Sequence, residues 1–92
     1  MRILVTPTFE RAVKKLHKPQ KLALDEAIRA IASQPDAGET KVGDLACVQV
    51  YKFRMGTLLC LLAYCVIDEN TLKLLMLGPH ENFYRDLKRT EH

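Results

Sequence analysis

Apolar residues recur at helical spacing through the first third of the chain. Residues 2–6, RILVT, form a short run of strand formers, and Thr6-Pro7 is typical of a helix start, with the threonine as N-cap and the proline in the first turn. One helix is predicted over residues 7–17. Lys18-Pro19 interrupts it, and a second helix is predicted over residues 19–34. The apolar stripes are Phe9, Val13 and Leu16 in the first helix, and Leu24, Ile28 and Ile31 in the second.

The apolar pattern changes after the loop-rich stretch of residues 35–43. Strands are predicted over residues 47–54, 57–67 and 71–78, because they are rich in β-formers and separated by turn-forming residues. A short C-terminal helix is predicted over residues 80–89, after Gly78-Pro79 ends the last strand. The turns between the strands are expected at Met55-Gly56 and at residues 68–70.

The predicted order of elements is strand, two helices, three strands and a helix, which indicates an α+β class. We expect an N-terminal strand and a helical hairpin packed on a twisted, mostly antiparallel sheet, with the short C-terminal helix last. The first strand precedes the hairpin, so it could lie beside the last strand and parallel to it. A chain of 92 residues is expected to form one domain, residues 1–92.

Composition removes several classes of protein. Hydrophobic residues make up 48% and charged residues 27%, an ordinary globular balance. The longest apolar stretch, residues 58–67, is too short to span a bilayer, and residues 1–5 are too short for a signal core. The three cysteines, Cys47, Cys60 and Cys65, form no CxxC pair and are odd in number. We therefore expect a cytoplasmic protein with reduced, structural thiols, no membrane partner and no bound metal.

The net charge is +3 and the pI is about 8.9, which permits a nucleic-acid partner. Strand alternation places Lys52 and Arg54 on one face with Val48 and Val50. The two cations would then lie about 7 Å apart along the strand, a spacing that suits a phosphodiester backbone. The alternative interpretation is ordinary surface charge at a strand end.

The segment after the last strand holds the candidate acid–base chemistry. In a helix, His80 and Tyr84 lie one turn apart on one side. Histidine can transfer protons near neutral pH, and tyrosine can stack on a base or donate a hydrogen bond. The alternative is that both residues serve only the helix start and its packing. The chain has no P-loop, GxGxxG, HExxH or GxSxG motif, and its single serine makes a serine triad implausible.

With these features the chain resembles the RelE/ParE superfamily of toxins from bacterial type II toxin–antitoxin systems, and within it a RelE-like branch. The resemblance covers nearly the whole chain. It implies two helices against a twisted sheet, whose opposite, concave face carries basic residues and holds RNA. The residues that carry it are KVGDL at 41–45, YKFR at 51–54, LLAY at 61–64 and LGPHENFYRDL at 77–87.

What the resemblance implies about activity is a metal-independent, ribosome-dependent mRNA endonuclease that inhibits translation and uses no cofactor. The adjacent 2′-OH attacks the phosphate, which requires proton transfer and cations against the developing charge. The implied partners are a cognate antitoxin, in a toxin–antitoxin hetero-oligomer, together with mRNA and the ribosome. The implied catalytic residues are His80, Tyr84, Arg54 and Lys52, and the implied RNA-binding residues are Lys41, Lys52, Arg54 and Arg85.

The sequence departs from many RNase members of the superfamily at two places. Met76 stands where they carry an arginine on the last strand, and the middle strand is apolar over residues 58–65. The set of phosphate-stabilising residues is therefore smaller than usual. Two further hypotheses stay open at this point: a non-enzymatic toxin of the gyrase-poison type, and an inactive homologue that keeps only its antitoxin-binding role.

Overall fold

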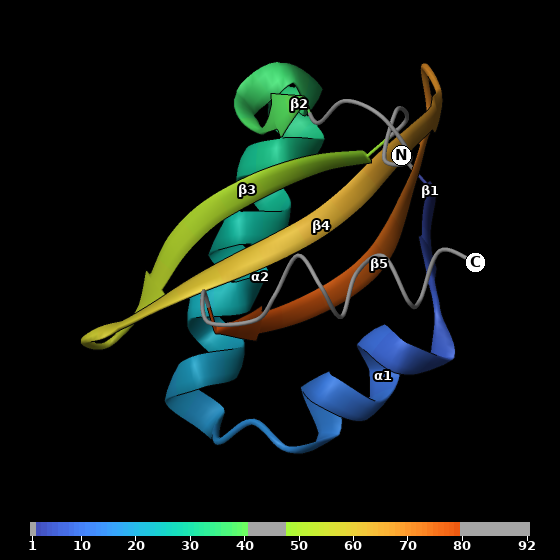
Figure 1. Ribbon diagram of the computed structural model, residues 1–92. Helices are drawn as coiled ribbons and strands as arrows, with labels where there is room; N and C mark the ends of the chain where they lie inside the picture. The colour runs from blue at the N-terminus through green and yellow to red at the C-terminus, as the bar shows by residue number, and fades with distance from the viewer. Residues whose placement is uncertain (1, 41–47, 80–92) are drawn as a thin grey trace.

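The computed structural model describes residues 2–40 and 48–79, which form two α-helices, a short 3-10 helix and a five-stranded sheet (Figure 1). The elements in chain order are β1 (Arg2–Val5), α1 (Pro7–Lys14), α2 (Lys18–Ser33), η1 (Pro35–Ala37), β2 (Glu39–Thr40), β3 (Val48–Met55), β4 (Leu58–Asp68) and β5 (Thr71–Pro79).

The sheet has the strand order β1-β5-β4-β3-β2. β1 pairs with β5 in parallel, and the other neighbouring pairs are antiparallel, so the expected parallel placement of the first strand is confirmed. Both helices lie on one face, α1 against β5 and α2 against β3 (Figure 1). This arrangement confirms the α+β class. The C-terminal helix expected over residues 80–89 lies outside the described residues.

Thr6 starts α1 and also ties it to the sheet. Its hydroxyl oxygen accepts a hydrogen bond from the backbone N–H of Phe9 at 3.1 Å, which confirms the predicted N-cap. The same hydroxyl donates to the backbone carbonyl of Leu75 on β5 at 2.6 Å. One side chain therefore satisfies an unpaired N–H of the helix and fixes where the helix begins relative to β5.

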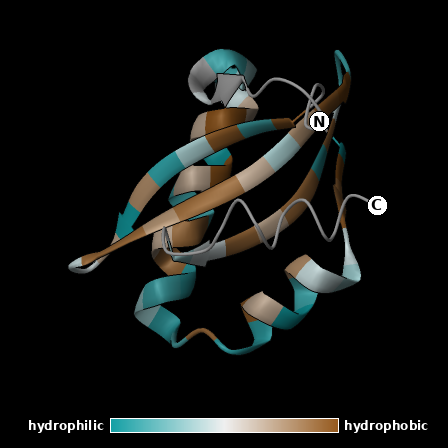
Figure 2. Ribbon diagram, in the orientation of Figure 1, coloured by the Kyte–Doolittle hydropathy of each residue, from teal (hydrophilic) through white to brown (hydrophobic). Residues whose placement is uncertain are grey.

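The core between the helices and the sheet consists of the predicted helical stripes and one face of three strands. Figure 2 shows the apolar residues concentrated along β4 and β5. Burial of each large apolar side chain contributes about 1.5–3 kcal/mol, so this layer is the main source of stability. Its buried members are Phe9, Leu24, Ala27, Ile31, Met55, Cys60, Leu62, Tyr64, Leu72, Leu74 and Leu77.

A second buried cluster lies on the opposite face of the sheet. The strand β4 is apolar over most of its length because residues of both its faces are buried. The register of β4 against β5 shifts between Ala63 and Tyr64, and this bulge leaves the consecutive residues Leu75 and Met76 on the same face. The members of the second cluster are Val48, Val50, Leu61, Ala63, Cys65, Leu75 and Met76.

Apart from element boundaries, such as the end of α1 at Lys14 rather than at residue 17, two details differ from the sequence-based expectation. The stretch predicted as a loop contains β2, whose residues Glu39 and Thr40 pair with Val50 and Gln49 of β3. The tight turn between β3 and β4 lies at residues 56–57, one position later than predicted, because Met55 is paired and buried as the last residue of β3. Gly56 supplies the positive φ of 63° that a two-residue hairpin turn requires.

The segment between α2 and β2 is held to the sheet by the hydroxyl of Tyr64, a side chain of β4 that is fully buried. The hydroxyl donates to the carbonyl of Pro35 at 2.6 Å and accepts from the N–H of Gly38 at 3.0 Å. Gln49 Oε1 lies 2.9 Å from the same oxygen. Burial raises the pKa of this phenol above its ordinary value, so it stays protonated and able to donate.

Candidate nucleic-acid interface

The two cations predicted on one strand face are found there. Lys52 and Arg54 are exposed on β3 and share their face with the buried Val48 and Val50. The alternate residues point to the helices, where the rings of Tyr51 and Phe53 stack with centroids 6.3 Å apart. The helices thus occupy one face of β3, and both cations are displayed on the other.

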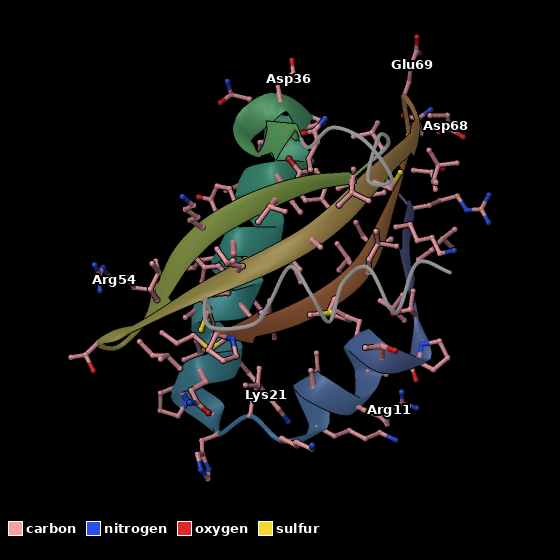
Figure 3. All side chains as sticks on the ribbon, viewed as in Figure 1. Arg11, Lys21, Asp36, Arg54, Asp68 and Glu69 are labelled. Atoms are coloured by element: carbon pink, nitrogen blue, oxygen red, sulfur yellow. The ribbon has the colours of Figure 1, made fainter. Side chains whose placement is uncertain are left out.

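Both cations lie near the β3–β4 hairpin. Arg54, labelled in Figure 3, donates from Nη1 to the carbonyl of Thr57 at 3.3 Å, a contact that holds the guanidinium beside the turn. Lys52 pairs across the sheet with Leu61, and Leu61 pairs with Gly78. Lys52 is therefore two strands away from the end of β5, a separation of about 10 Å.

β5 ends at Pro79, which pairs with Cys60 at the same end of the sheet. His80 is the next residue in the chain, so the segment with the candidate acid–base residues begins two strands from Lys52. The predicted site residues Lys41, His80, Tyr84 and Arg85 lie outside the described residues, and their roles stay predictions.

The bulge on β5 decides which way Met76 points. Strict alternation from Leu72 and Leu74 would turn Met76 toward the helices. The extra residue instead turns it to the face of Lys52, where it is 7% exposed and pairs with Ala63. The position at which the resemblance implies an arginine therefore belongs to the sheet face of Lys52, and here it holds an uncharged, buried side chain.

Lys73 is a cation of the same face that the sequence analysis did not single out. It is exposed and pairs with Cys65, which in turn pairs with Val48. It lies at the opposite end of the face from Arg54, beyond the buried cluster. The alternation of Leu72, Lys73 and Leu74 was the signal that could have identified it.

The described thiols are structural. Cys60 and Cys65 are buried, one on each face of the sheet, and neither is in a disulfide. Burial raises the pKa of the Cys60 thiol, which keeps it protonated and unreactive. Cys47 lies outside the described residues. Across residues 2–40 and 48–79 no cluster of three potential metal ligands occurs, and neither helix is long and apolar enough to cross a bilayer.

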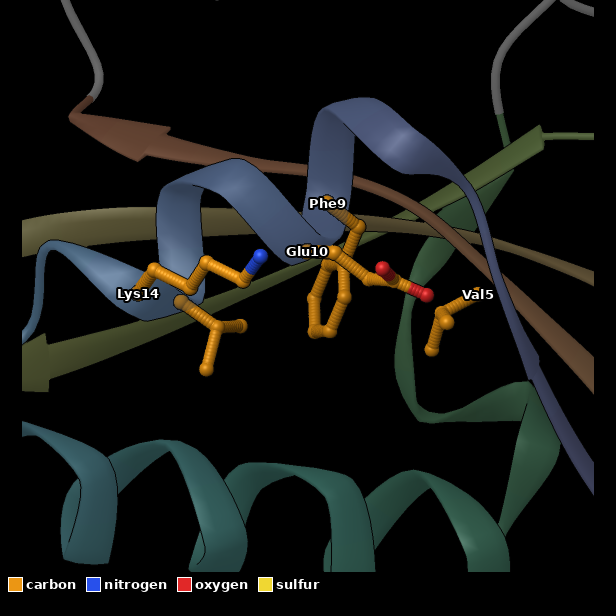
Figure 4. Close-up of a pocket in the computed structure, with 5 residues that line it drawn as sticks. Val5, Phe9, Glu10 and Lys14 are labelled. Atoms are coloured by element: carbon orange, nitrogen blue, oxygen red, sulfur yellow. The ribbon is translucent and has the colours of Figure 1, made fainter.

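An open hollow of about 380 Å³ lies between the end of β1 and α1 (Figure 4). Its apolar lining comes from Val5, Phe9 and Val13, and its charged lining from Glu10 and Lys14. The hollow belongs to the helix side of the sheet and is distinct from the face that carries Lys52.

The family comparison and the fold together define one class, a small toxin domain of α+β fold. The chain belongs to the family of ParE-like toxins of type II bacterial toxin–antitoxin systems, whose family model matches residues 3–88. No curated protein sequence matches the chain.

Two solved structures share the fold. One is the E. coli toxin RelE in the free state, as a double arginine-to-alanine mutant, with a TM-score of 0.74 and 15% identity over 98% of this chain and 92% of that one. The other is the intact E. coli RelBE toxin–antitoxin complex, with a TM-score of 0.71 and 18% identity over 87% of this chain and 96% of the matched chain. At this level of identity the likeness concerns the fold.

Proposed function

We propose that this toxin is a metal-independent endoribonuclease that cuts mRNA on the ribosome and thereby inhibits translation. The observation that carries the proposal is the placement of Lys52 and Arg54, exposed together on the sheet face that the helices leave uncovered. The end of β5 lies two strands from Lys52, and the chain continues from there directly into His80.

The proposed reaction is an internal phosphoryl transfer. The 2′-oxygen attacks the adjacent phosphorus, its proton passes to a general base, and the 5′-oxygen of the next nucleotide leaves with a proton from a general acid. His80 is assigned to proton transfer, and Tyr84 orients it or stacks on a base. Lys52 and Arg54 offset the charge that builds on the phosphate oxygens, and Arg85 and Lys41 bind the backbone.

The decisive experiment replaces His80 with alanine and follows growth arrest after induction at equal expression. Loss of a general acid or base typically costs 10²–10⁴-fold in rate. The variant is expected to lose toxicity, while it keeps the circular dichroism spectrum of the wild type and still binds its antitoxin. His92→Ala is the matched control, because it removes the same kind of side chain at the last position of the sequence. Full toxicity of the His80 variant would refute the assignment.

A non-enzymatic toxin of the gyrase-poison type is the second candidate, and the buried Met76 is the observation that favours it. With an uncharged residue at this position, the sheet face of Lys52 has one cation fewer to stabilise a transition state than it would have with an arginine there. Measurement of protein synthesis and DNA supercoiling in the same induced culture separates the two. Loss of supercoiling with sustained translation would establish the second candidate, and no effect on either would indicate an inactive, antitoxin-binding homologue.

We infer that a cognate antitoxin restrains this toxin in the cytoplasm by forming a hetero-oligomer with it. The edge strand β1 exposes Ile3, Leu4 and Val5 by about two-fifths each. Such an apolar edge, next to the hollow lined by Phe9 and Val13, offers an extended or helical partner segment a place to bury its side chains. Purification from the native operon should yield a bound small partner, and consistent recovery of the toxin alone would contradict this.

A further inference from the structure

The turn between α1 and α2 carries the densest concentration of positive charge in the described chain. Residues 11–21 contain five cations and no carboxylate. All five are exposed, and the one polar contact of their side chains within the described residues joins Arg11 Nη2 to Thr8 Oγ1 at 3.4 Å. We call this surface the cationic turn; it consists of Arg11, Lys14, Lys15, Lys18 and Lys21.

Three of the described carboxylates lie at the opposite end of the molecule, whereas Glu10, Asp25 and Glu26 lie on the two helices that the turn joins. In Figure 3, Arg11 and Lys21 lie at the bottom, whereas Asp36, Asp68 and Glu69 lie at the top, on η1 and on the β4–β5 turn. Within residues 11–21 themselves no carboxylate offsets the five cations, so a polyanion is attracted to this surface. Arg54 lies at the side of the molecule, near the β3–β4 hairpin, so the cationic turn is a surface separate from the sheet face.

Helix stability does not account for this charge. Lys18 and Lys21 occupy the first turn of α2, which holds no acidic residue. Cations at the N-terminal end of a helix oppose its macrodipole, so these two lysines weaken the helix rather than support it. Their effect on the fold is unfavourable, and a ligand that carries negative charge would offset it.

We propose that the cationic turn binds the phosphate backbone of folded RNA, independently of the sheet face with Lys52 and Arg54. The proposal rests on the proposed function, because a ribosome-dependent endonuclease needs a grip on RNA besides its substrate strand. On α1 and α2 the only large apolar side chain that is exposed is Leu22, directly after the turn. A single leucine beside five cations differs from protein interfaces, which bury apolar cores and are depleted in lysine. The turn has no Phe, Tyr or Trp on which bases could stack, so contact with the backbone is independent of sequence.

The test is the salt dependence of binding to a fluorescein-labelled RNA hairpin with 2′-O-methyl riboses, which a 2′-OH mechanism cannot cut. Fluorescence anisotropy is measured between 50 and 300 mM KCl for the double variant Lys18→Gln/Lys21→Gln. Each lost phosphate contact lowers the slope of log K against log salt by about 0.7–0.9, so the double variant should lose about 1.4–1.8. Its melting temperature should not fall, since both cations oppose the helix dipole.

The matched control is Arg2→Gln/Arg29→Gln, which removes the same charge from two exposed residues outside the turn. The control should keep the wild-type slope. Equal slopes for the two double variants would overturn the proposal. Unchanged RNA binding with a weakened antitoxin complex would assign the turn to the antitoxin and would overturn it as well.

Failure of this proposal and failure of the proposed function are distinguishable. If the wild type cuts mRNA but the turn variant binds the hairpin with the slope of the control, only the cationic turn is refuted. If the salt dependence of RNA binding is weaker in the turn variant while the wild type cuts no mRNA, the RNA-binding proposal is supported and the endonuclease proposal is refuted.

Discussion

Replacement of Tyr64 with phenylalanine tests how the segment between α2 and β2 is held. The ring stays, so the apolar core keeps its volume, and only the hydroxyl is removed. That hydroxyl donates to Pro35 at 2.6 Å and accepts from Gly38 at 3.0 Å, so both backbone groups lose a partner. The segment then continues into β2 and towards Lys41. A local loss of order here would therefore affect residues that the RNA-binding proposal uses.

The expected cost follows from these two groups. A buried polar group left without a partner costs about 1–3 kcal/mol, and both bonds are only partly shielded from water, so the sum should be about 2–3 kcal/mol. A domain of 92 residues has a total stability of about 5–14 kcal/mol. The variant should therefore fold, with a clearly reduced margin.

Urea unfolding measures this loss. With a typical m-value of about 1–1.5 kcal/mol/M for a domain of this size, the midpoint should fall by roughly 1.3–3 M. Gly38→Ala provides a second perturbation of the same contact, because a Cβ there would lie 2.7 Å from the Tyr64 hydroxyl. It should cost less in the Tyr64→Phe background than in the wild type. A midpoint within about 0.3 M of the wild type, or strict additivity of the two changes, would refute this account.

The pH dependence has a defined sign. Burial raises the pKa of Tyr64 above its ordinary value of 10.0, and the charges of Asp36 and Tyr51 act in the same direction, against a lowering by the Gly38 N–H. The folded state holds this proton more tightly than the unfolded state. The stability gained is therefore present below pH 10 and lost as the pH rises further. Tyr64→Phe should lose less stability than the wild type between pH 10 and 12.

Three further predictions concern other parts of the molecule. Cys60→Ala should cost about 1 kcal/mol in urea unfolding and leave toxicity intact, because the thiol is buried and protonated; inactivity without a change in melting temperature would contradict it. Gly56→Ala should cost about 1–2 kcal/mol by the same measurement, because only the positive φ opposes the new Cβ and no atom lies within 4 Å of it. Lys52→Ala and Arg54→Ala should each lower the salt slope of binding to single-stranded RNA by about 0.7; an unchanged slope in both would leave them as ordinary surface charge.

Local patterns in the sequence were sufficient for much of the fold. The N-cap at Thr6 depends on the residue type and the proline after it, and both act within a single turn. The face shared by Lys52 and Arg54 follows from alternation along one uninterrupted strand. The parallel pairing of β1 with β5 follows from the helical hairpin that separates β1 from the rest of the sheet.

Contacts between distant residues could not be predicted in this way. The bulge leaves Leu75 without a partner residue on β4, and its carbonyl instead accepts a hydrogen bond from the hydroxyl of Thr6, 69 positions earlier. Nothing in the apolar run from Leu74 to Leu77 marks where alternation breaks. The strand β2 is likewise too short to have a pattern of its own and depends on its pairing with β3. In the candidate site, the orientation of Met76 could not be predicted, because it follows from the bulge at Leu75.

The buried centre of the candidate face determines where this chain can contact an anionic ligand. Val50, Ala63 and Met76 lie in one row across three strands, and each is less than one-tenth exposed. A cation buried in that row would lose its hydration. Its attraction to a phosphate would have to exceed this desolvation cost before it could contribute to binding. Among the described residues, the cations of this face therefore lie at its rim, Lys52 and Arg54 near the hairpin and Lys73 at the other end. The cationic turn of the helices adds charge that is already hydrated and exposed, and so it can bind phosphate without that cost. Under the proposed function, the cationic turn therefore adds to the RNA affinity of Lys52 and Arg54, whereas the chemistry stays at the sheet face.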